Sequence, residues 1–292
     1  MEYDLTVILG PTASGKTKFA VKMACETGGE IISADSRQVY RGMDIGTGKD
    51  LDEYSYNGIS IPYHLIDIVD AGTKYNLFEY HRDFLKAFDD IRSRGKHPIL
   101  CGGTGLYIEA VTKNYLLPEV PPDPALREEL QNLSMEELAH RLSSLKKLHN
   151  TSDLDSKKRV IRAIEVAMYE HNHPSTSEEK GKTTGSELNC RFIGISVDRD
   201  ERNRRIDARL RYRLEHGMVE EVKGLLDKGI PPEDLIYYGL EYKFVTQYLI
   251  NQLTYDEMEQ RLAIAIHQFA KRQMTWFRGM ERRGVSIEWI NV

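Results

Sequence analysis

The sequence predicts an α/β fold, in which a parallel sheet is flanked by helices and interrupted by an all-helical insertion. Three observations support this prediction. Short apolar runs alternate with helical segments over the first 117 residues, which is typical of parallel sheets. A glycine-rich loop stands between the first of these runs and the first helical segment. After a proline-stiffened connector, LLPEVPPDP, the pattern is helical only.

The elements of the first part follow from local patterns. The run LTVIL predicts a strand over 5–9, and KTKFAVKMACETG predicts a helix that ends near Gly28. The apolar spacing of 76–95 predicts a second helix, which also ends at a glycine. Further strands are predicted at 30–36 and 63–70, and over 96–107 a strand runs into a glycine-rich turn and a helix start.

The insertion is predicted from helix-start signals. Asp123 before Pro124 is a capping residue followed by proline, and Ser134 with Glu137 fits a capping box. A third helix is expected over 151–171 and a polar loop over 171–187. Strand character returns at 190–198, and we expect the remainder to be mostly helical. We therefore assign 1–117 and 191–292 to one core and 118–190 to the helical insertion.

Composition narrows the class of protein. Charged residues make up 29% and hydrophobic residues 40% of the 292 residues, which is typical of globular proteins, and the formal net charge is −5. No apolar run is long enough to span a membrane, and no secretory signal is visible. The three cysteines lack metal-ligand spacing. We expect a cytoplasmic monomer with no membrane partner.

The string GPTASGKT at 10–17 fits G-x-x-x-x-G-K-[ST], the P-loop that commonly binds ATP or GTP, so the fold is expected to be P-loop NTPase-like. Its backbone N–H groups would form an anion nest at a helix N-terminus. Lys16 would add a point charge, and the Thr17 hydroxyl would ligate Mg²⁺. The candidate phosphate-binding residues are Gly10, Pro11, Thr12, Ala13, Ser14, Gly15, Lys16 and Thr17.

Two later segments carry further candidates. Asp35 and Ser36 end the second predicted strand, at the edge where ligands bind in open α/β sheets. A carboxylate there could act as a general base, although a simple Asp-Ser turn is equally compatible. CGGTGLY places Thr104 in a glycine-rich turn, where it could contact a phosphate. No acid follows ILC, so a Walker B strand is missing, which counts against an ordinary ATPase.

Three basic clusters stand out in this acidic chain. The first lies in the opening turns of a predicted helix, where cations oppose the helix dipole. Each cluster alone could be a solvated face, but together they favour contact with phosphate or nucleic acid. Their members are Lys157, Lys158, Arg159 and Arg162; Arg202, Arg204, Arg205, Arg209, Arg211 and Arg213; and Lys271, Arg272 and Arg278 beside Trp276 and Phe277.

In combination, GPTASGKT, ISADSRQVYRGMDIGTGK, CGGTGLYIEAV, KKRVIRAIEV and FAKRQMTWFR resemble the tRNA isopentenyltransferase (dimethylallyltransferase) family. The matches occur in family order and span nearly the whole chain. Two positions depart from the family pattern. Lys158 stands where a glutamine is usual, and YYGLEYKF at 237–244 replaces I-G-Y-K-E. The second departure bears on local packing or tRNA contacts rather than on the diphosphate site.

The resemblance implies transfer of a dimethylallyl group from dimethylallyl diphosphate to N6 of adenosine 37 in the tRNA anticodon stem-loop. It implies that the P-loop holds the prenyl diphosphate with Mg²⁺, that Asp35 is the general base and that Thr104 contacts the diphosphate and substrate. Either Arg205 or Arg209 should reach the diphosphate. The helical insertion should clamp the tRNA. The implied tRNA contacts are Asp35, Ser36, Arg37, Gln38, Lys158, Arg159, Val160, Ile161 and Arg162.

The chemistry is consistent with this reading. An allylic diphosphate ionises readily, so catalysis needs an anion cradle and Mg²⁺. The alternatives are an isopentenyltransferase of free adenine nucleotides, a P-loop kinase of small metabolites and a non-catalytic tRNA-binding module. The helical insertion disfavours the first, the missing Walker B acid the second, and the intact loop with Asp35 and Thr104 the third.

Overall fold

The computed structural model describes residues 2–115, 119–145, 154, 156–173 and 188–292. Two compact units are present, the larger formed by Met1–Tyr115 with Glu187–Val292 and the smaller by Leu116–Ser186. Each unit is considered by itself. In the described part of the chain, no helix is both long and apolar enough to cross a membrane.

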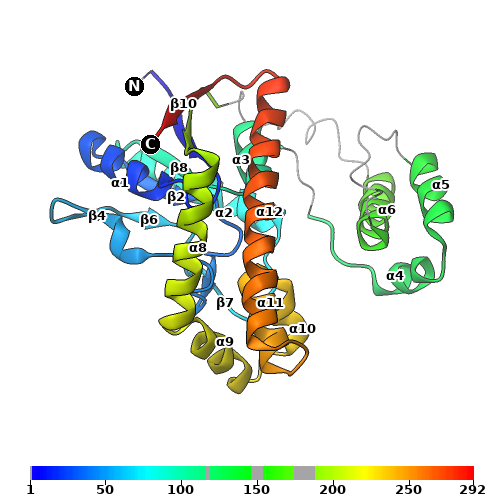
Figure 1. Ribbon diagram of the computed structural model, residues 1–292. Helices are drawn as coiled ribbons and strands as arrows, with labels where there is room; N and C mark the ends of the chain where they lie inside the picture. The colour runs from blue at the N-terminus through cyan, green and yellow to red at the C-terminus, as the bar shows by residue number, and fades with distance from the viewer. Residues whose placement is uncertain (1, 116–118, 146–153, 155, 174–187) are drawn as a thin grey trace. The chain divides into compact units, whose positions relative to one another are not determined.

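The larger unit is built on a six-stranded sheet in which every neighbouring pair of strands is parallel (Figure 1). This confirms the predicted α/β class. The strand order is β10 (Ile287–Asn291), β9 (Cys190–Ser196), β1 (Leu5–Leu9), β8 (Pro98–Gly102), β2 (Glu30–Ser33) and β6 (Tyr63–His64). Two small sheets pair β3 (Tyr40–Arg41) with β7 (Val69–Asp70) and β4 (Ser55–Tyr56) with β5 (Ile59–Ser60).

Helices pack on both faces of the sheet. Successive strand side chains point to opposite faces, and β1 shows this directly. Ile8 belongs to an apolar cluster that includes residues of α1, whereas Val7 and Leu9 belong to a second cluster with residues of α2, α3, α8 and α12. The helices are α1 (Lys16–Thr27), α2 (Leu77–Ser93), α3 (Gly105–Thr112), α8 (Arg199–Glu215), α9 (Met218–Asp227), α10 (Pro232–Tyr237), α11 (Leu240–Leu249) and α12 (Tyr255–Arg282), with a short 3₁₀ helix, η1 (Leu51–Tyr54).

One sequence expectation was wrong. Residues 63–70 do not form one strand, because Leu65 and Asp67 adopt left-handed backbone angles that interrupt the extended chain. The segment instead contributes β6 to the main sheet and β7 to a small one. The C-terminal remainder is mostly helical, as expected, although β10 adds an unpredicted edge strand beside β9. The apolar residues Ile287 and Trp289, separated by the polar Glu288, are the signal that could have revealed it.

The smaller unit contains α4 (Pro124–Gln131), α5 (Met135–Leu145) and α6 (Lys157–Asn172), packed around leucines and isoleucines. Both predicted helix starts are confirmed. The Asp123 side chain accepts from the N–H of Leu126, and Ser134 and Glu137 form the reciprocal capping box. The predicted helix over 151–171 is observed from Lys157. Residues 151–153 and 155, and most of the predicted loop over 171–187, lie outside the described residues.

Candidate active site

The P-loop connects the end of β1 to the start of α1. Ala13 and Gly15 both have left-handed backbone angles, with φ of 61° and 82°, which turn the loop at the helix N-terminus. A Cβ on Gly10 would lie 2.6 Å from the carbonyl oxygen of Ile195, so only glycine fits there. Of the eight predicted phosphate-binding residues, Gly10, Pro11 and Ser14 are buried and line neither cavity described below.

A polar cavity of about 480 Å³ opens beside this loop. The P-loop supplies part of its wall, together with Asp35 and Gln38 from the segment after β2 and two arginines of α8. Its lining includes Thr12, Ala13, Gly15, Lys16, Thr17, Asp35, Gln38, Arg205 and Arg209. The tertiary structure thus gathers most of the predicted core site residues around one space.

An aromatic cavity of about 420 Å³ adjoins the polar one, and both share Thr12, Lys16, Asp35, Thr47 and Arg209. Sequence reasoning missed most of its lining, because these residues come from the start of α3, from the end of α10, from α11 and from one face of α12. They include Leu106, Tyr238, Leu240, Tyr242, Ile266, Phe269 and Trp276. The segment 237–244, which departs from the family pattern, lines the aromatic cavity and contributes no residue to the polar one.

Asp35 and Thr104 are joined through the turn after β2. The N–H of Ser36 donates to the Thr104 hydroxyl over 3.2 Å, and the N–H of Arg37 donates to Asp35 Oδ1 over 2.8 Å. The second bond is the Asp-Ser turn that the sequence left as an alternative. It leaves Asp35 Oδ2 without a hydrogen bond within the described residues, so the turn is compatible with a carboxylate that faces the cavities.

Gln273 of α12 links the P-loop to the glycine-rich turn after β8. Its Oε1 accepts the Thr12 N–H over 2.8 Å, and its Nε2 donates to the Gly103 carbonyl over 3.0 Å. A Cβ on Gly103 would approach Gln273 Nε2 to 2.3 Å, and a Cβ on Gly105 would approach the Trp276 ring to 2.1 Å. The glycines of CGGTG therefore permit close contact with α12. Both α12 residues belong to the string KRQMTWFR, but they are so far from the glycine-rich turn in the sequence that the contact could not be predicted.

Two cations that line both cavities, Lys16 and Arg209, are partly buried. Burial lowers the pKa of the Lys16 ammonium, and burial lowers the pKa of the Arg209 guanidinium to about 10. Burial also raises the pKa of the Cys101 thiol to about 12, so it remains neutral. An anion between these two groups would favour their charged forms and offset the cost of burying them. The electrostatics favour a phosphate group.

The two candidate arginines differ in their surroundings. Arg205 is half-exposed and its Nε donates to Glu201 over 2.7 Å along the same helix. Arg209 lines both cavities, and its guanidinium donates to the Thr12 hydroxyl of the P-loop. The position of Arg209 therefore favours it over Arg205 as a diphosphate ligand.

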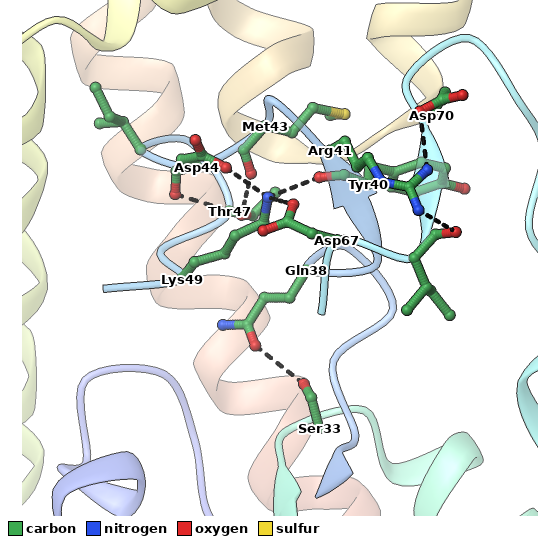
Figure 2. Close-up of polar contacts among 12 residues, drawn as sticks. Ser33, Gln38, Tyr40, Arg41, Met43, Asp44, Thr47, Lys49, Asp67 and Asp70 are labelled. Atoms are coloured by element: carbon green, nitrogen blue, oxygen red, sulfur yellow. Dashed lines mark hydrogen bonds and ion pairs between the residues drawn. The ribbon is translucent and has the colours of Figure 1, made fainter. Parts of the chain in front are cut away.

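Arg37 and Gln38 are neighbours in the sequence but line different cavities. Arg37 lines the aromatic cavity, with its guanidinium carbon 5.5 Å from the Tyr237 ring centre. Gln38 lines the polar cavity and is fixed at both ends of its amide. Figure 2 shows its oxygen accepting from Ser33 Oγ, and its nitrogen donates to the Gly48 carbonyl, each over 3.0 Å.

The predicted RNA-contacting residues of α6 belong to the smaller unit. Lys158 and Arg159 are exposed, whereas Val160 and Ile161 are buried in the apolar core of that unit. Arg162 pairs with the buried Glu165 and donates to the carbonyl of Val120 over 2.9 Å. Part of the cluster thus stabilises the unit itself.

The chemistry of the polar cavity fits Mg²⁺. The Thr17 hydroxyl and the Asp35 carboxylate, both hard oxygen donors, line it together. No group of three acidic, histidine or cysteine side chains capable of holding a metal occurs among the described residues. The oxygens of Thr17 and Asp35 suit a cation that takes one or two protein ligands and completes its shell with phosphate and water.

Comparison with known proteins gives a consistent result. A family model described as IPP transferase matches residues 38–280, and one described as isopentenyl transferase matches 3–59. The chain is 58% identical over 290 residues to tRNA dimethylallyltransferase 2 of Bacteroides fragilis, covering 99% of this chain and 93% of that protein. It is 59% identical over 287 residues to tRNA dimethylallyltransferase 1 of Porphyromonas gingivalis, covering 98% and 93%.

Solved structures of related enzymes also match this chain. The crystal structure of a tRNA isopentenylpyrophosphate transferase from Bacillus halodurans matches with a TM-score of 0.69 and 34% identity, covering 100% of this chain and 90% of that one. A eukaryotic dimethylallyltransferase acting on tRNA shares the fold at a TM-score of 0.78 and 23% identity, covering 98% and 73%. The P-loop, the paired cavities, the family match and these relatives together show that the chain belongs to the IPP transferase family.

Proposed function

We propose that this protein transfers the dimethylallyl group of dimethylallyl diphosphate to N6 of adenosine 37 in tRNA and releases diphosphate. The observation that carries the proposal is the junction of the two cavities. Asp35, Lys16 and Arg209 line both of them, so a carboxylate and two cations lie where the polar space beside the P-loop adjoins the more apolar, aromatic one. A prenyl diphosphate has one anionic end and one apolar end, and this pair of spaces complements both.

The residues of the chain divide the chemistry between them. Backbone N–H groups of the P-loop, Lys16 and Arg209 bind the diphosphate and stabilise the charge that develops on it as the C1–O bond breaks. The adenine N6 forms the new bond to C1, and its proton passes to the Asp35 carboxylate. Thr104 orients the turn that carries Asp35. Mg²⁺, bound by the Thr17 hydroxyl, would supply further positive charge against the leaving group.

The RNA would enter through the aromatic cavity. Adenosine 37 lies in a loop, where a base can be unstacked and turned outward at low cost. Trp276 and Phe269, both partly exposed at the cavity, offer rings on which such a base can stack. We propose that the segment 35–38 contacts the same RNA, and that Lys158 and Arg159 of the smaller unit bind its phosphates. A tRNA substrate also places the activity in the cytoplasm.

A transfer assay separates this function from its alternatives. The protein is incubated with dimethylallyl diphosphate and Mg²⁺, in parallel with an anticodon stem-loop carrying adenines at positions 36 to 38, with AMP, and with ATP plus small metabolites. We expect prenylated RNA modified at position 37. Prenylated AMP with unmodified RNA would instead indicate a free-nucleotide enzyme, and phosphorylated metabolites a kinase.

The role of Asp35 has its own test. In Asp35→Asn we expect kcat to fall by roughly 10²- to 10⁴-fold, the contribution typical of a general base. Binding of inorganic pyrophosphate with Mg²⁺, followed by calorimetry, should change little. If pyrophosphate binding is lost in parallel with kcat, Asp35 acts as a metal ligand and the base assignment is wrong.

A further inference from the structure

The loop formed by residues 43–49 contributes to both cavities. Gly46 and Thr47 line the aromatic cavity, and Thr47 with Gly48 lines the polar one. The loop contains no strand, so side-chain contacts must help to fix its position. Two charged side chains, Glu221 of α9 and Lys49 at the end of the loop itself, supply several of these contacts.

Glu221 of α9 holds the loop through its backbone. Oε2 accepts from the N–H groups of Asp44 and Ile45 over 2.8 and 2.7 Å, and Oε1 accepts from that of Gly46 over 3.0 Å. The Tyr242 hydroxyl donates to the same Oε1 over 2.6 Å. Four donors converge on one carboxylate, and such charge-assisted bonds are about twice as strong as neutral ones.

Lys49 holds the other end of the loop. Its side chain is 1% exposed, and burying an ammonium is costly unless each of its protons is bonded. Nζ donates to the Tyr40 carbonyl over 2.7 Å, to Asp44 Oδ1 over 2.5 Å and to Asp67, so three protons meet three acceptors (Figure 2). Because Asp44 also donates its N–H to Glu221, it joins the two anchors.

The anchors also connect the loop to the aromatic cavity. Tyr242 lines that cavity, and a Cβ on Gly46 would approach its ring to 2.7 Å. The same ring therefore packs on the loop while its hydroxyl bonds Glu221. By contrast, the cations and hydroxyl that face the proposed diphosphate lie elsewhere, Lys16 and Thr17 on α1 and Arg209 on α8.

We propose that Glu221 and Lys49 are positioning residues that hold the 43–49 loop as a preformed wall of the cavity that receives the acceptor base. This inference rests on the proposed function. The wall shapes the space for adenine and the prenyl chain, so loosening it should impair transfer to RNA far more than binding of pyrophosphate. Neither residue touches the reacting atoms.

The main test uses Glu221→Gln and Tyr242→Phe. In Glu221→Gln one acceptor oxygen becomes an NH₂ donor that faces N–H groups, whereas Tyr242→Phe removes one donor and keeps the ring. Glu220→Gln, an exposed neighbour on α9, is the matched control. Lys49→Met, which leaves two carboxylates without their cation, is compared with the exposed Lys223→Met.

Three quantities are measured for each variant: kcat/KM for the stem-loop, the Kd of pyrophosphate with Mg²⁺, and hydrogen exchange of the amides of residues 44–46. For Glu221→Gln we expect kcat/KM to fall at least tenfold, pyrophosphate Kd to change less than threefold, and the three amides to exchange at least tenfold faster. Tyr242→Phe should show a smaller change in the same direction, and both controls should match the native chain.

Unchanged transfer in Glu221→Gln, or equal losses in transfer and pyrophosphate binding, would overturn the proposal. If Lys49→Met does not fold, the Glu221 and Tyr242 variants still decide it. Hydrogen exchange needs no turnover, so a native chain that fails to modify RNA refutes the proposed function separately. In that case, unchanged exchange at 44–46 in Glu221→Gln refutes the anchoring itself.

Discussion

Replacing Gln273 with leucine tests whether α12 fixes the P-loop against the glycine-rich turn. Leucine has a similar volume and a helix propensity close to that of glutamine, so the helix itself should be unaffected. The change removes both hydrogen bonds of a buried side chain. It leaves the Thr12 N–H and the Gly103 carbonyl without their partner.

The expected magnitude follows from those two groups. A buried backbone donor or acceptor left unsatisfied costs about 1–3 kcal/mol. With two such groups, Gln273→Leu should lower the free energy of unfolding by roughly 2–6 kcal/mol, with the lower end applying if water reaches one of them. Because the start of the P-loop loses its anchor, pyrophosphate affinity should also fall at least fivefold, which corresponds to about 1 kcal/mol.

Urea unfolding and calorimetric titration with pyrophosphate and Mg²⁺ measure the two effects. Lys271→Leu, an exposed position on α12, is the matched control and should change each by little. Gln273→Glu adds a second comparison, because a carboxylate can accept from Thr12 but cannot donate to Gly103. We expect it to be destabilised as well.

A result in which Gln273→Leu unfolds within about 0.5 kcal/mol of the Lys271 control, with native pyrophosphate affinity, would refute this reasoning. It would mean that the two backbone groups find other partners and that the loop does not depend on α12. If Gln273→Leu loses stability but keeps its affinity for pyrophosphate, the two hydrogen bonds stabilise the fold as argued. Only the predicted effect on pyrophosphate binding is then wrong.

Three further predictions concern single sites. Hydrogen bonding from Arg94 holds the pKa of the buried Glu30 carboxyl at about 2, below its ordinary 4.5. The Glu30 carboxylate therefore stabilises the fold fully above its ordinary pKa of 4.5, and this contribution is lost as the pH falls towards 2. Urea unfolding between pH 5 and pH 2 should show a loss of up to about 3 kcal/mol that is smaller in Glu30→Gln. Ala13→Gly should leave thermal stability unchanged or raise it by up to about 1 kcal/mol, since relief of the left-handed Ala13 offsets the entropy of glycine; a clear loss would contradict this. Arg209→Lys should weaken pyrophosphate binding at least tenfold and Arg205→Lys less than twofold, and equal effects in calorimetry would reject the choice between them.

Patterns local to the chain were sufficient for much of the fold. The run 5–9 is mostly apolar and wholly buried, GPTASGKT needs a strand before it and a helix after it, and the capping box of Ser134 with Glu137 starts α5 where it was expected. The strand expected over 63–70 does not form as one element, because Leu65 and Asp67 adopt left-handed backbone angles. Such angles are uncommon in residues other than glycine, so the sequence did not predict them. Strand β10 was missed because its apolar alternation is short.

The sequence by itself determined the α/β class, the anion loop and the individual candidates Lys16, Thr17, Asp35 and Thr104, because each depends on neighbours within a few residues. Only the tertiary structure decided which distant side chains complete the site. Gln273 meets Gly103 across 170 positions, and Glu221 meets Gly46 across 175. Such contacts arise when α9 and α12 pack against the core, and the energy of packing is set by the whole surface buried rather than by any local string. That is why GPTASGKT indicated a phosphate, whereas the aromatic cavity beside it became visible only in the folded chain.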